Sequence, residues 1–307
     1  MTYDAQLDAK LGIIRDSLSR IGKIDFAGDI SVIPSPQPFE YRSRARWHAD
    51  RDEETIGYYA RDSHAIIDVA TCPILIPQLE DTMLSLRKNT KWKDVMAGRA
   101  EIDASVADGE AVSIYSPDLI EPTREITHTH DGVEYAFSAR SFFQGNKYLI
   151  GELIARALDG ANGETALDLY CGVGLFTLPL AKKFTHVIGV EENAEAIRFA
   201  KQNKARAGLT NVDFKRTSAR EFLAGHNLEE TDFVLIDPPR AGAENGVIKR
   251  LAELSPRSIS YVSCEPSILA RDLRILLDSG YHIDTITALD LFPQTHHVET
   301  VVRLCRV

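Results

Sequence analysis

Reactive side chains recur at three places in the C-terminal half of the chain, each beside a short apolar run. Asp237-Pro238-Pro239-Arg240 follows one run, Ser263-Cys264-Glu265-Pro266 follows the next, and Phe292–Glu299 precedes the last. A cysteine thiolate is a potential nucleophile and a carboxylate a potential general base. We therefore consider covalent chemistry in which Cys264 attacks and Glu299 removes a proton; a structural cysteine and a solvated strand residue are the alternatives.

The position of Cys264 distinguishes it from the other three cysteines. Pro266 is expected to begin a helix, so that Cys264 would lie near a helix N-terminus, which favours a thiolate. Cys171 is the rival nucleophile, but it lies inside a glycine turn, where we interpret it as a packing residue. Cys305 receives only a structural interpretation.

A glycine turn precedes these motifs. Asp168–Gly174 runs from an apolar strand into the turn, and Glu191 ends the next strand. Such turns let a ligand approach the backbone, and an acid at this spacing binds ribose hydroxyls. Leu175-Phe176-Thr177 lacks the third glycine of the dinucleotide fingerprint, and the pattern resembles the first motif of class I methyltransferases. We predict S-adenosylmethionine as the cofactor; structural glycines are the alternative.

Strand and helix patterns alternate after Phe142, which predicts a parallel sheet covered on both faces. The expected strands are 165–170, 186–191, 212–215, 232–237, 258–263, 281–290 and 298–304, and the expected helices are 146–158, 194–207, 218–223, 244–254 and 266–278. The fold is predicted to be α/β, of the class I methyltransferase type, with a Rossmann-like, seven-stranded, mostly parallel sheet. Ligands bind at the carboxyl ends of such strands, and the residues expected at that edge are Tyr170, Glu191, Asp237 and Cys264.

The earlier part of the chain has a different pattern. Apolar spacings of three and four predict a helix over 4–21, and strand-like segments over 39–71 and 99–137 flank a helix near 77–89. We predict two domains. Residues 1–139 would form an N-terminal helix with a smaller mixed α+β region that presents RNA, and residues 140–307 the methyltransferase domain.

Basic residues cluster in one segment although the chain is acidic. The formal net charge of −10 disfavours RNA as a ligand if charge is considered globally. Tyr41–His48 nevertheless contains Arg42, Arg44 and Arg46. We treat these arginines as candidate RNA contacts; a solvated face of an edge strand is the alternative.

Cys264 and Glu299 match the chemistry needed to methylate carbon 5 of uracil, a weak nucleophile. A thiolate that adds to carbon 6 turns the ring into an enolate, whose carbon 5 can attack the methyl group of a sulfonium. A base then removes the carbon 5 proton, and the thiol is eliminated. The target base would have to leave its stack.

Together the motifs resemble the RNA uracil-5 methyltransferases, which form 5-methyluridine in transfer and ribosomal RNA. The resemblance spans nearly the whole chain and is carried by Ser141–Asn146, Asp168–Gly174, Asp237–Gly242, Ser263–Asp272 and Phe292–Glu299. It implies Cys264 as nucleophile and Glu299 as base. The residues that it implies around the cofactor are Gln144, Tyr170, Glu191 and Asp237, with Ser218 as a further contact. We predict that Arg240 meets the RNA or the base.

The chain departs from the family pattern at two places. Glu265 stands where the family usually has Asn; because a negative charge there would raise the pKa of Cys264, we expect Glu265 to point away or the specificity to differ. Cys72, in Thr71–Leu75, resembles the last ligand of a 4Fe-4S cluster whose other ligands, like an N-terminal barrel, are missing. One cysteine cannot hold a cubane. We expect no cluster or other metal, in either a truncated chain or a lineage that lost the cluster.

Three general features set the remaining expectations. No apolar run approaches the ~18 residues of a membrane span, Met1–Asp4 does not resemble a signal peptide, and the cysteines form no disulfide framework. We expect a cytoplasmic monomer that acts on transfer or ribosomal RNA, without a membrane partner. An amino methyltransferase acting on adenine or cytosine and a non-catalytic RNA-binding relative are the alternatives.

Overall fold

The chain forms two compact units, each described by itself below. The computed structural model describes residues 1–88, 98–117, 123–225 and 231–306. Unit 1 comprises Met1–Pro36 and Leu149–Val307, and unit 2 comprises Gln37–Tyr148. This division differs from the predicted boundary between residues 139 and 140, because the first 36 residues pack with the C-terminal part of the chain. Within the described residues, no helix is both long and apolar enough to cross a membrane.

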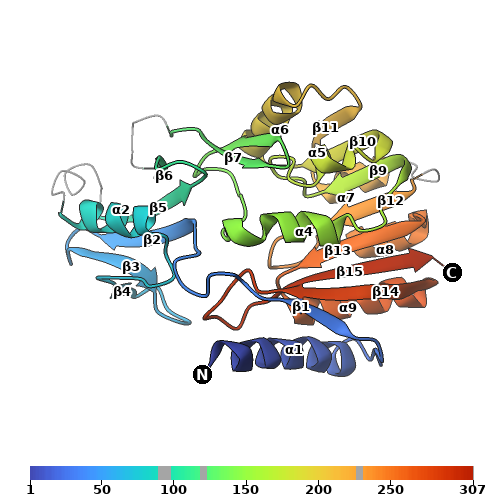
Figure 1. Cartoon of the computed structure of the whole chain (residues 1–307), viewed down its shortest axis with the longest axis horizontal. Coiled ribbons are helices and arrows are strands. Elements are labelled where there is room, and N and C mark those ends of the chain that lie inside the picture. The colour runs from blue at the N-terminus through green and yellow to red at the C-terminus, as the bar shows by residue number, and fades with distance from the viewer. Residues whose placement is uncertain (89–97, 118–122, 226–230, 307) are drawn as a thin grey trace. The chain divides into compact units, whose positions relative to one another are not determined.

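Unit 1 is built on an eight-stranded sheet in the order β1-β14-β15-β13-β12-β9-β10-β11 (Figure 1). Strand β15 is antiparallel to both of its neighbours, and the other pairs are parallel. This confirms the predicted α/β class with a mostly parallel sheet. The strands are β1 (Ile30–Ile33), β9 (Gly163–Leu169), β10 (Phe184–Glu191), β11 (Val212–Arg216), β12 (Phe233–Ile236), β13 (Ser258–Ser263), β14 (Tyr281–Leu289) and β15 (Glu299–Arg306).

The prediction of seven strands was wrong by one, because β1 was missed. Its four residues pair in parallel with β14, from Ile30 opposite Ile286 to Ile33 opposite Leu289. A segment this short has little periodicity, and only its pairing with β14 defines it as a strand. Strand β1 extends the sheet at the β14 edge and makes the N-terminal segment part of unit 1.

Helices cover both faces of this sheet. Apolar residues of α1, α7, α8 and α9 form one continuous core with the sheet. Helices α4, α5 and α6 contact strands of the same sheet without contributing to that core, and therefore cover the other face. The helices are α1 (Tyr3–Arg20), α4 (Ile150–Ala157), α5 (Thr177–Leu180), α6 (Ala194–Arg206), α7 (Ala219–Gly225), α8 (Val247–Leu254) and α9 (Pro266–Asp278).

Unit 2 is a smaller α+β structure, as its sequence pattern predicted. A five-stranded antiparallel sheet has the order β4-β3-β2-β5-β6, and β7 and β8 form a separate hairpin. Helix α2 contacts β3, β5 and β6, and Trp47 is fully buried in the shared core. The elements are β2 (Arg44–Asp50), β3 (Thr55–Tyr59), β4 (Ile66–Asp68), α2 (Pro77–Lys88), β5 (Arg99–Val106), β6 (Val112–Tyr115), β7 (Ile126–His130) and β8 (Val133–Phe137).

Helix α1 is docked closely on α9, and Figure 1 shows the two side by side. Ile14 and Leu18 are buried in the core of unit 1. Gly22, just after the helix, has no room for a side chain: a Cβ atom would lie 2.8 Å from the carbonyl oxygen of Ala270 in α9 and 2.9 Å from that of Leu18. The absence of a side chain at Gly22 therefore permits the close approach of the two helices.

We predict opposite effects for two glycine substitutions in this segment. Gly22→Ala forces backbone atoms apart and should lower the free energy of unfolding by about 1–3 kcal/mol. Gly12→Ala, within α1, places its methyl group where no atom lies within 4 Å. It should raise the stability by about 0.5–1 kcal/mol because alanine favours the helix. Urea unfolding followed by circular dichroism measures both; equal effects would contradict the close approach.

Candidate active site

The predicted reactive residues of unit 1 lie at one edge of the sheet. Tyr170, Asp237 and Cys264 directly follow β9, β12 and β13, and Glu191 ends β10. These four strands run in the same direction. Because β15 runs antiparallel, Glu299 begins it at this same edge, and the next residue, Thr300, pairs with Ser263. The register therefore places the segments that carry Cys264 and Glu299 next to each other.

The glycine turn after β9 is held by Glu191. Its Oε2 accepts a hydrogen bond from the amide of Gly172 at 3.1 Å, and its Oε1 accepts one from the amide of Asn193 at 2.7 Å. Gly172 has φ +55, and no atom lies within 4 Å of where its Cβ would stand. The turn thus presents open backbone beside a carboxylate, an arrangement suited to a ligand with hydroxyl groups.

Tyr170 is fixed by a residue that the sequence analysis did not identify, Glu244. The Tyr170 hydroxyl donates to Glu244 Oε2 at 2.7 Å and accepts from the Glu244 amide at 3.3 Å. Tyr170 has φ +65, a conformation uncommon for a residue with a side chain. Burial and the Glu244 carboxylate raise the pKa of Tyr170. The two bonds connect the cofactor turn to the segment that follows the Asp237 motif.

Two aspartates at this edge of the sheet have raised pKa values. Asp168 is fully buried and accepts a hydrogen bond from Thr177 Oγ1 at 2.5 Å. Burial raises the pKa of Asp168 to about 8, with a contribution from Asp237. Burial likewise raises the pKa of Asp237 to about 7. Negative charge is therefore unfavourable at this edge unless a cation compensates it.

Cys264 lies two residues before the first residue of α9, as expected, but its surroundings oppose ionisation. Burial raises the pKa of the thiol to about 12, and the charges of Glu299 and Asp237 act in the same direction. Arg240 lowers it through its charge and a hydrogen bond. Desolvation and the neighbouring carboxylates therefore act against the thiolate that the position before α9 was expected to favour.

Glu299 is itself buried, with 4% of its surface exposed. Burial raises its pKa well above the ordinary value, and Asp237 raises it further. Arg240 opposes this shift as well. The Arg240 guanidinium carbon also lies 5.9 Å from the centre of the Phe292 ring. Arg240 is thus a cation shared by the candidate nucleophile and the candidate base.

The carboxylate of Glu265 is directed toward α9. Its Oε1 accepts a hydrogen bond from Ser267 Oγ at 2.7 Å. The carboxylates that raise the pKa of Cys264 are those of Glu299 and Asp237. Glu265 therefore fits the first of the two expectations, a side chain that points away from the nucleophile.

The two remaining cofactor candidates occupy different settings. Ser218 precedes α7, and its Oγ accepts a hydrogen bond from the amide of Glu221 at 3.1 Å, which caps that helix. Gln144 belongs to unit 2, where its side chain is buried. Its predicted contact with the cofactor, like that of Ser218, stays a prediction.

The three arginines proposed as RNA contacts all bond to unit 2 itself. Arg46 forms a two-pronged ion pair with Asp103, with both nitrogen–oxygen distances 3.0 Å. Arg44 donates to the Ser141 carbonyl at 2.6 Å, and Arg42 donates to the carbonyl of Arg44 at 2.9 Å. About half of the Arg46 side chain is exposed, against 20% for Arg44. Arg46 therefore has the more accessible guanidinium of these two.

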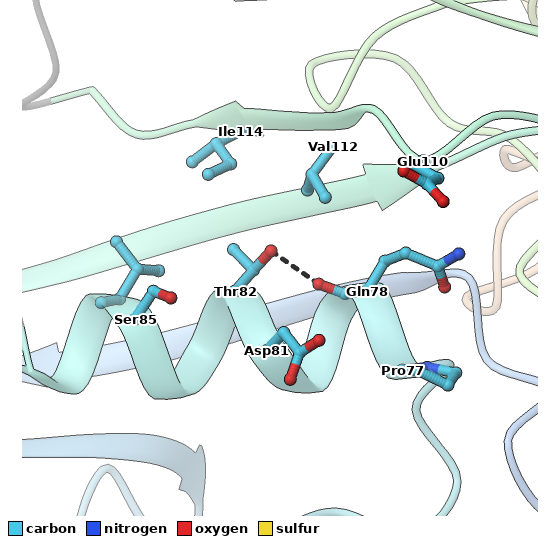
Figure 2. A pocket seen from close by; sticks show the side chains of 9 residues that line it. Pro77, Gln78, Asp81, Thr82, Ser85, Glu110, Val112 and Ile114 are labelled. Carbon is cyan, nitrogen blue, oxygen red and sulfur yellow. Dashed lines mark hydrogen bonds between the residues drawn. The ribbon is translucent and has the colours of Figure 1, made fainter.

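Cys72 is a free, partly buried cysteine that packs against the core of unit 2, and the Tyr58 hydroxyl donates to its sulfur at 3.6 Å. Among the described residues, no group of three or more His, Cys, Asp or Glu side chains is arranged to hold a metal ion. A pocket of about 690 Å³ lies elsewhere in unit 2, between α2 and β6 (Figure 2). Asp81 and Glu110 contribute to its wall, which disfavours RNA phosphates there.

Comparison with known proteins identifies the class. The model of the tRNA (uracil-5-)-methyltransferase family matches residues 111–307. A 23S rRNA (uracil(1939)-C(5))-methyltransferase of Klebsiella pneumoniae is 32% identical, over 89% of this chain and 72% of the relative. An enzyme of the same name from an Enterobacter species is 33% identical, over 89% of this chain and 73% of the relative.

A solved structure is similar over nearly the whole chain. It is a Pyrococcus abyssi tRNA (uracil-54, C5)-methyltransferase in complex with S-adenosyl-L-homocysteine, with a TM-score of 0.78, 29% identity, and 99% of this chain and 84% of that chain covered. The fold and the matches together define an S-adenosylmethionine-dependent α/β methyltransferase. The chain belongs to the RNA uracil-5 methyltransferase family. This confirms the predicted family, enzyme class and, at the level of the family, the cofactor.

The geometry of the turn predicts a specific role for Glu191. Glu191→Ala removes the carboxylate that faces the open turn and should weaken S-adenosylmethionine binding by about 10- to 100-fold, the range expected for losing a charged hydrogen-bonding group. Glu192→Ala is the matched control, because Glu192 is the exposed neighbour. Isothermal titration calorimetry measures both affinities. Equal affinity of the Glu191→Ala variant and the wild type would contradict the assignment.

Proposed function

We propose that this protein transfers a methyl group from S-adenosylmethionine to carbon 5 of a uridine in RNA through a covalent adduct with Cys264. One observation carries the proposal: at the sheet edge, beside an open glycine turn, Cys264 follows the end of β13 and the buried Glu299 begins the neighbouring strand β15. Ser263 pairs with Thr300, so Cys264 and Glu299 follow and precede paired residues. A methyl transfer that needed no nucleophile would give no chemical role to the adjacent positions of Cys264 and Glu299.

The residues at the edge fit the proposed cofactor. Gly172 leaves open space at the turn, and Glu191 offers carboxylate oxygens for ribose hydroxyls. Asp168 and Asp237 would be stabilised in their ionised forms by a cationic ligand, and the sulfonium and ammonium groups of S-adenosylmethionine are cationic. We propose Tyr170 as another contact of the cofactor and Ser218 as a further one, and carry over Gln144 of unit 2 as a contact that the family resemblance implies. When bound, the cofactor supplies an electrophilic methyl group.

Cys264 would begin the reaction as a thiolate, after losing its proton to water. Its sulfur forms a bond to carbon 6 of the uracil, and the electron pair of the carbon 5–carbon 6 double bond moves into the ring as an enolate. Carbon 5 then forms a bond to the methyl group as the methyl–sulfur bond breaks, with the electron pair of that bond staying on the sulfur of the methyl donor. Arg240 lowers the pKa of the thiol and is therefore the residue that supports the nucleophilic form.

Glu299 would complete the reaction. Its carboxylate takes the carbon 5 proton, the double bond re-forms, and the carbon 6–sulfur bond breaks with its electron pair returning to Cys264. The raised pKa of Glu299 makes it a stronger base once it is ionised. Asp237 and Arg240 shift that pKa in opposite directions, so that both residues tune the same proton transfer.

The substrate in this proposal is transfer or ribosomal RNA. The similar proteins from Klebsiella and Pyrococcus are named for 23S ribosomal RNA and transfer RNA, respectively. Unit 2 would present the RNA, with Arg42, Arg44 and Arg46 among its contacts, and the target uridine would leave its stack. Four free cysteines are consistent with a reducing cytoplasm, where we propose that the protein acts as a monomer.

A trapping experiment tests the covalent mechanism. With S-adenosylmethionine and 5-fluorouridine-substituted RNA, the wild type should accumulate a stable protein–RNA adduct, since fluorine cannot be removed as a proton. Cys264→Ala should form none, whereas Cys305→Ala, which changes another partly exposed cysteine, should react like the wild type. Denaturing gel electrophoresis detects the adduct.

Transfer RNA transcripts and 23S ribosomal RNA fragments, tested separately, distinguish the two substrate classes in this experiment. An adduct that survives Cys264→Ala, or full methylation by that variant, would contradict the mechanism. Full methylation by Cys264→Ala would favour an amino methyltransferase, and failure to bind S-adenosylmethionine would favour a non-catalytic RNA-binding protein.

A further inference from the structure

Helix α1 contacts the loop that leads into Glu299. This loop, Asp290–Val298, leaves the sheet after β14 and returns at the first residue of β15. Leu289 pairs with Glu299, so the residues that flank the loop face each other across the two strands. A displacement of either end of the loop therefore acts directly on the backbone of Glu299.

Lys10 of α1 holds the start of this loop through a buried ion pair. Its ammonium lies 2.5 Å from Asp290 Oδ1 and donates to the carbonyl oxygen of Phe292 at 2.9 Å. Lys10 is 3% exposed and Asp290 1%. A lysine is rarely this deeply buried, and burying two charges is unfavourable unless their geometry is good. Such a pair is therefore weak evidence for stability, but its two contacts tie the start of the loop to α1.

Gln6, one turn earlier in α1, holds the middle of the loop. Its side-chain Nε2 donates to Gln294 Oε1, and the backbone amide of Gln294 donates to Gln6 Oε1, both at 3.1 Å. Gln294 has φ +64. Residues with side chains keep this conformation only where the surroundings hold them in it. The amide–amide pair with Gln6 is such a constraint.

The Phe292 carbonyl is where these contacts converge. Besides Lys10, it accepts hydrogen bonds from the amide and the hydroxyl of Thr295, at 3.2 and 2.8 Å. The ring of the same residue faces the Arg240 guanidinium. The loop thus contains one turn, at Phe292–Thr295, that α1 holds through Lys10. The same loop continues to Glu299.

We propose that Lys10 and Gln6 are positioning residues for Glu299, and that α1 is required for the final step of the reaction. The inference depends on the proposed function. In that step the carbon 5–hydrogen bond breaks, its proton passes to the Glu299 carboxylate, its electron pair forms the carbon 5–carbon 6 double bond, and the carbon 6–sulfur pair returns to Cys264. Addition of Cys264 should be affected less, because Cys264 lies between β13 and α9, outside the Asp290–Val298 loop.

Two variants and a matched control test the inference. Gln6→Ala removes the contact to Gln294, and the double variant Lys10→Met/Asp290→Leu replaces the ion pair by apolar residues without leaving one charge buried. The control, Arg20→Gln, removes a cation of α1 whose ion pair with Asp16 is exposed. Each protein receives S-adenosylmethionine and either unsubstituted or 5-fluorouridine-substituted transcripts of transfer RNA and 23S ribosomal RNA.

With unsubstituted RNA, both variants should form 5-methyluridine about 10- to 100-fold more slowly, the range for a misplaced reacting group. They should also accumulate the covalent protein–RNA complex, while Arg20→Gln matches the wild type. With fluorinated RNA, adduct formation does not involve proton removal. The variants should therefore form the adduct at a rate within about threefold of the wild-type rate, a much smaller change than the loss expected with unsubstituted RNA. This separation of the two steps would not arise from partial unfolding.

Two results would overturn the inference. One is turnover at the wild-type rate without accumulation of the complex; the other is an equal loss of adduct formation and of product. If the wild type itself forms no adduct with fluorinated RNA, the proposed function fails, and the role of α1 fails with it. The behaviour of the wild type and that of the variants therefore distinguish the two failures.

Discussion

The structure of the site depends on the burial of acidic groups at one edge of the sheet. Asp168, Asp237 and Glu299 all have raised pKa values because water is excluded, and the thiol of Cys264 is affected in the same way. Arg240 opposes the shifts of both the thiol and Glu299. Such a site suits cationic ligands and proton transfer.

The fold assembles this edge by the direction of its strands. The parallel strands β9, β10, β12 and β13 bring their carboxyl ends together, and the antiparallel β15 adds its beginning. Without that reversal, Glu299 would lie at the opposite edge from Cys264. Helix α1 completes the arrangement, because Lys10 and Gln6 contact the loop through which β15 is reached. The N-terminal segment therefore belongs to unit 1, although the sequence pattern suggested a separate region.

Much of the sheet could be predicted because strand ends follow from local patterns. Apolar runs locate β9 to β15, and the rule for parallel sheets then brings Cys264 and Asp237 to one edge. Strand β1, the Lys10–Asp290 pair and the contact of Glu244 with Tyr170 were missed, since each depends on partners far apart in the chain. Local sequence shows the helix start after Cys264 but not the desolvation that raises the pKa of its thiol.

The ionisation of Cys264 gives the most direct test of the account. The rate of its alkylation by iodoacetamide can be followed as a function of pH, with mass spectrometry of the peptide that contains it. The account predicts a rate that still rises above about pH 9, beyond the ordinary thiol value, and a lower pKa in Glu299→Gln, where a neighbouring negative charge is removed. A pKa at or below that ordinary value, or one unchanged by Glu299→Gln, would contradict it.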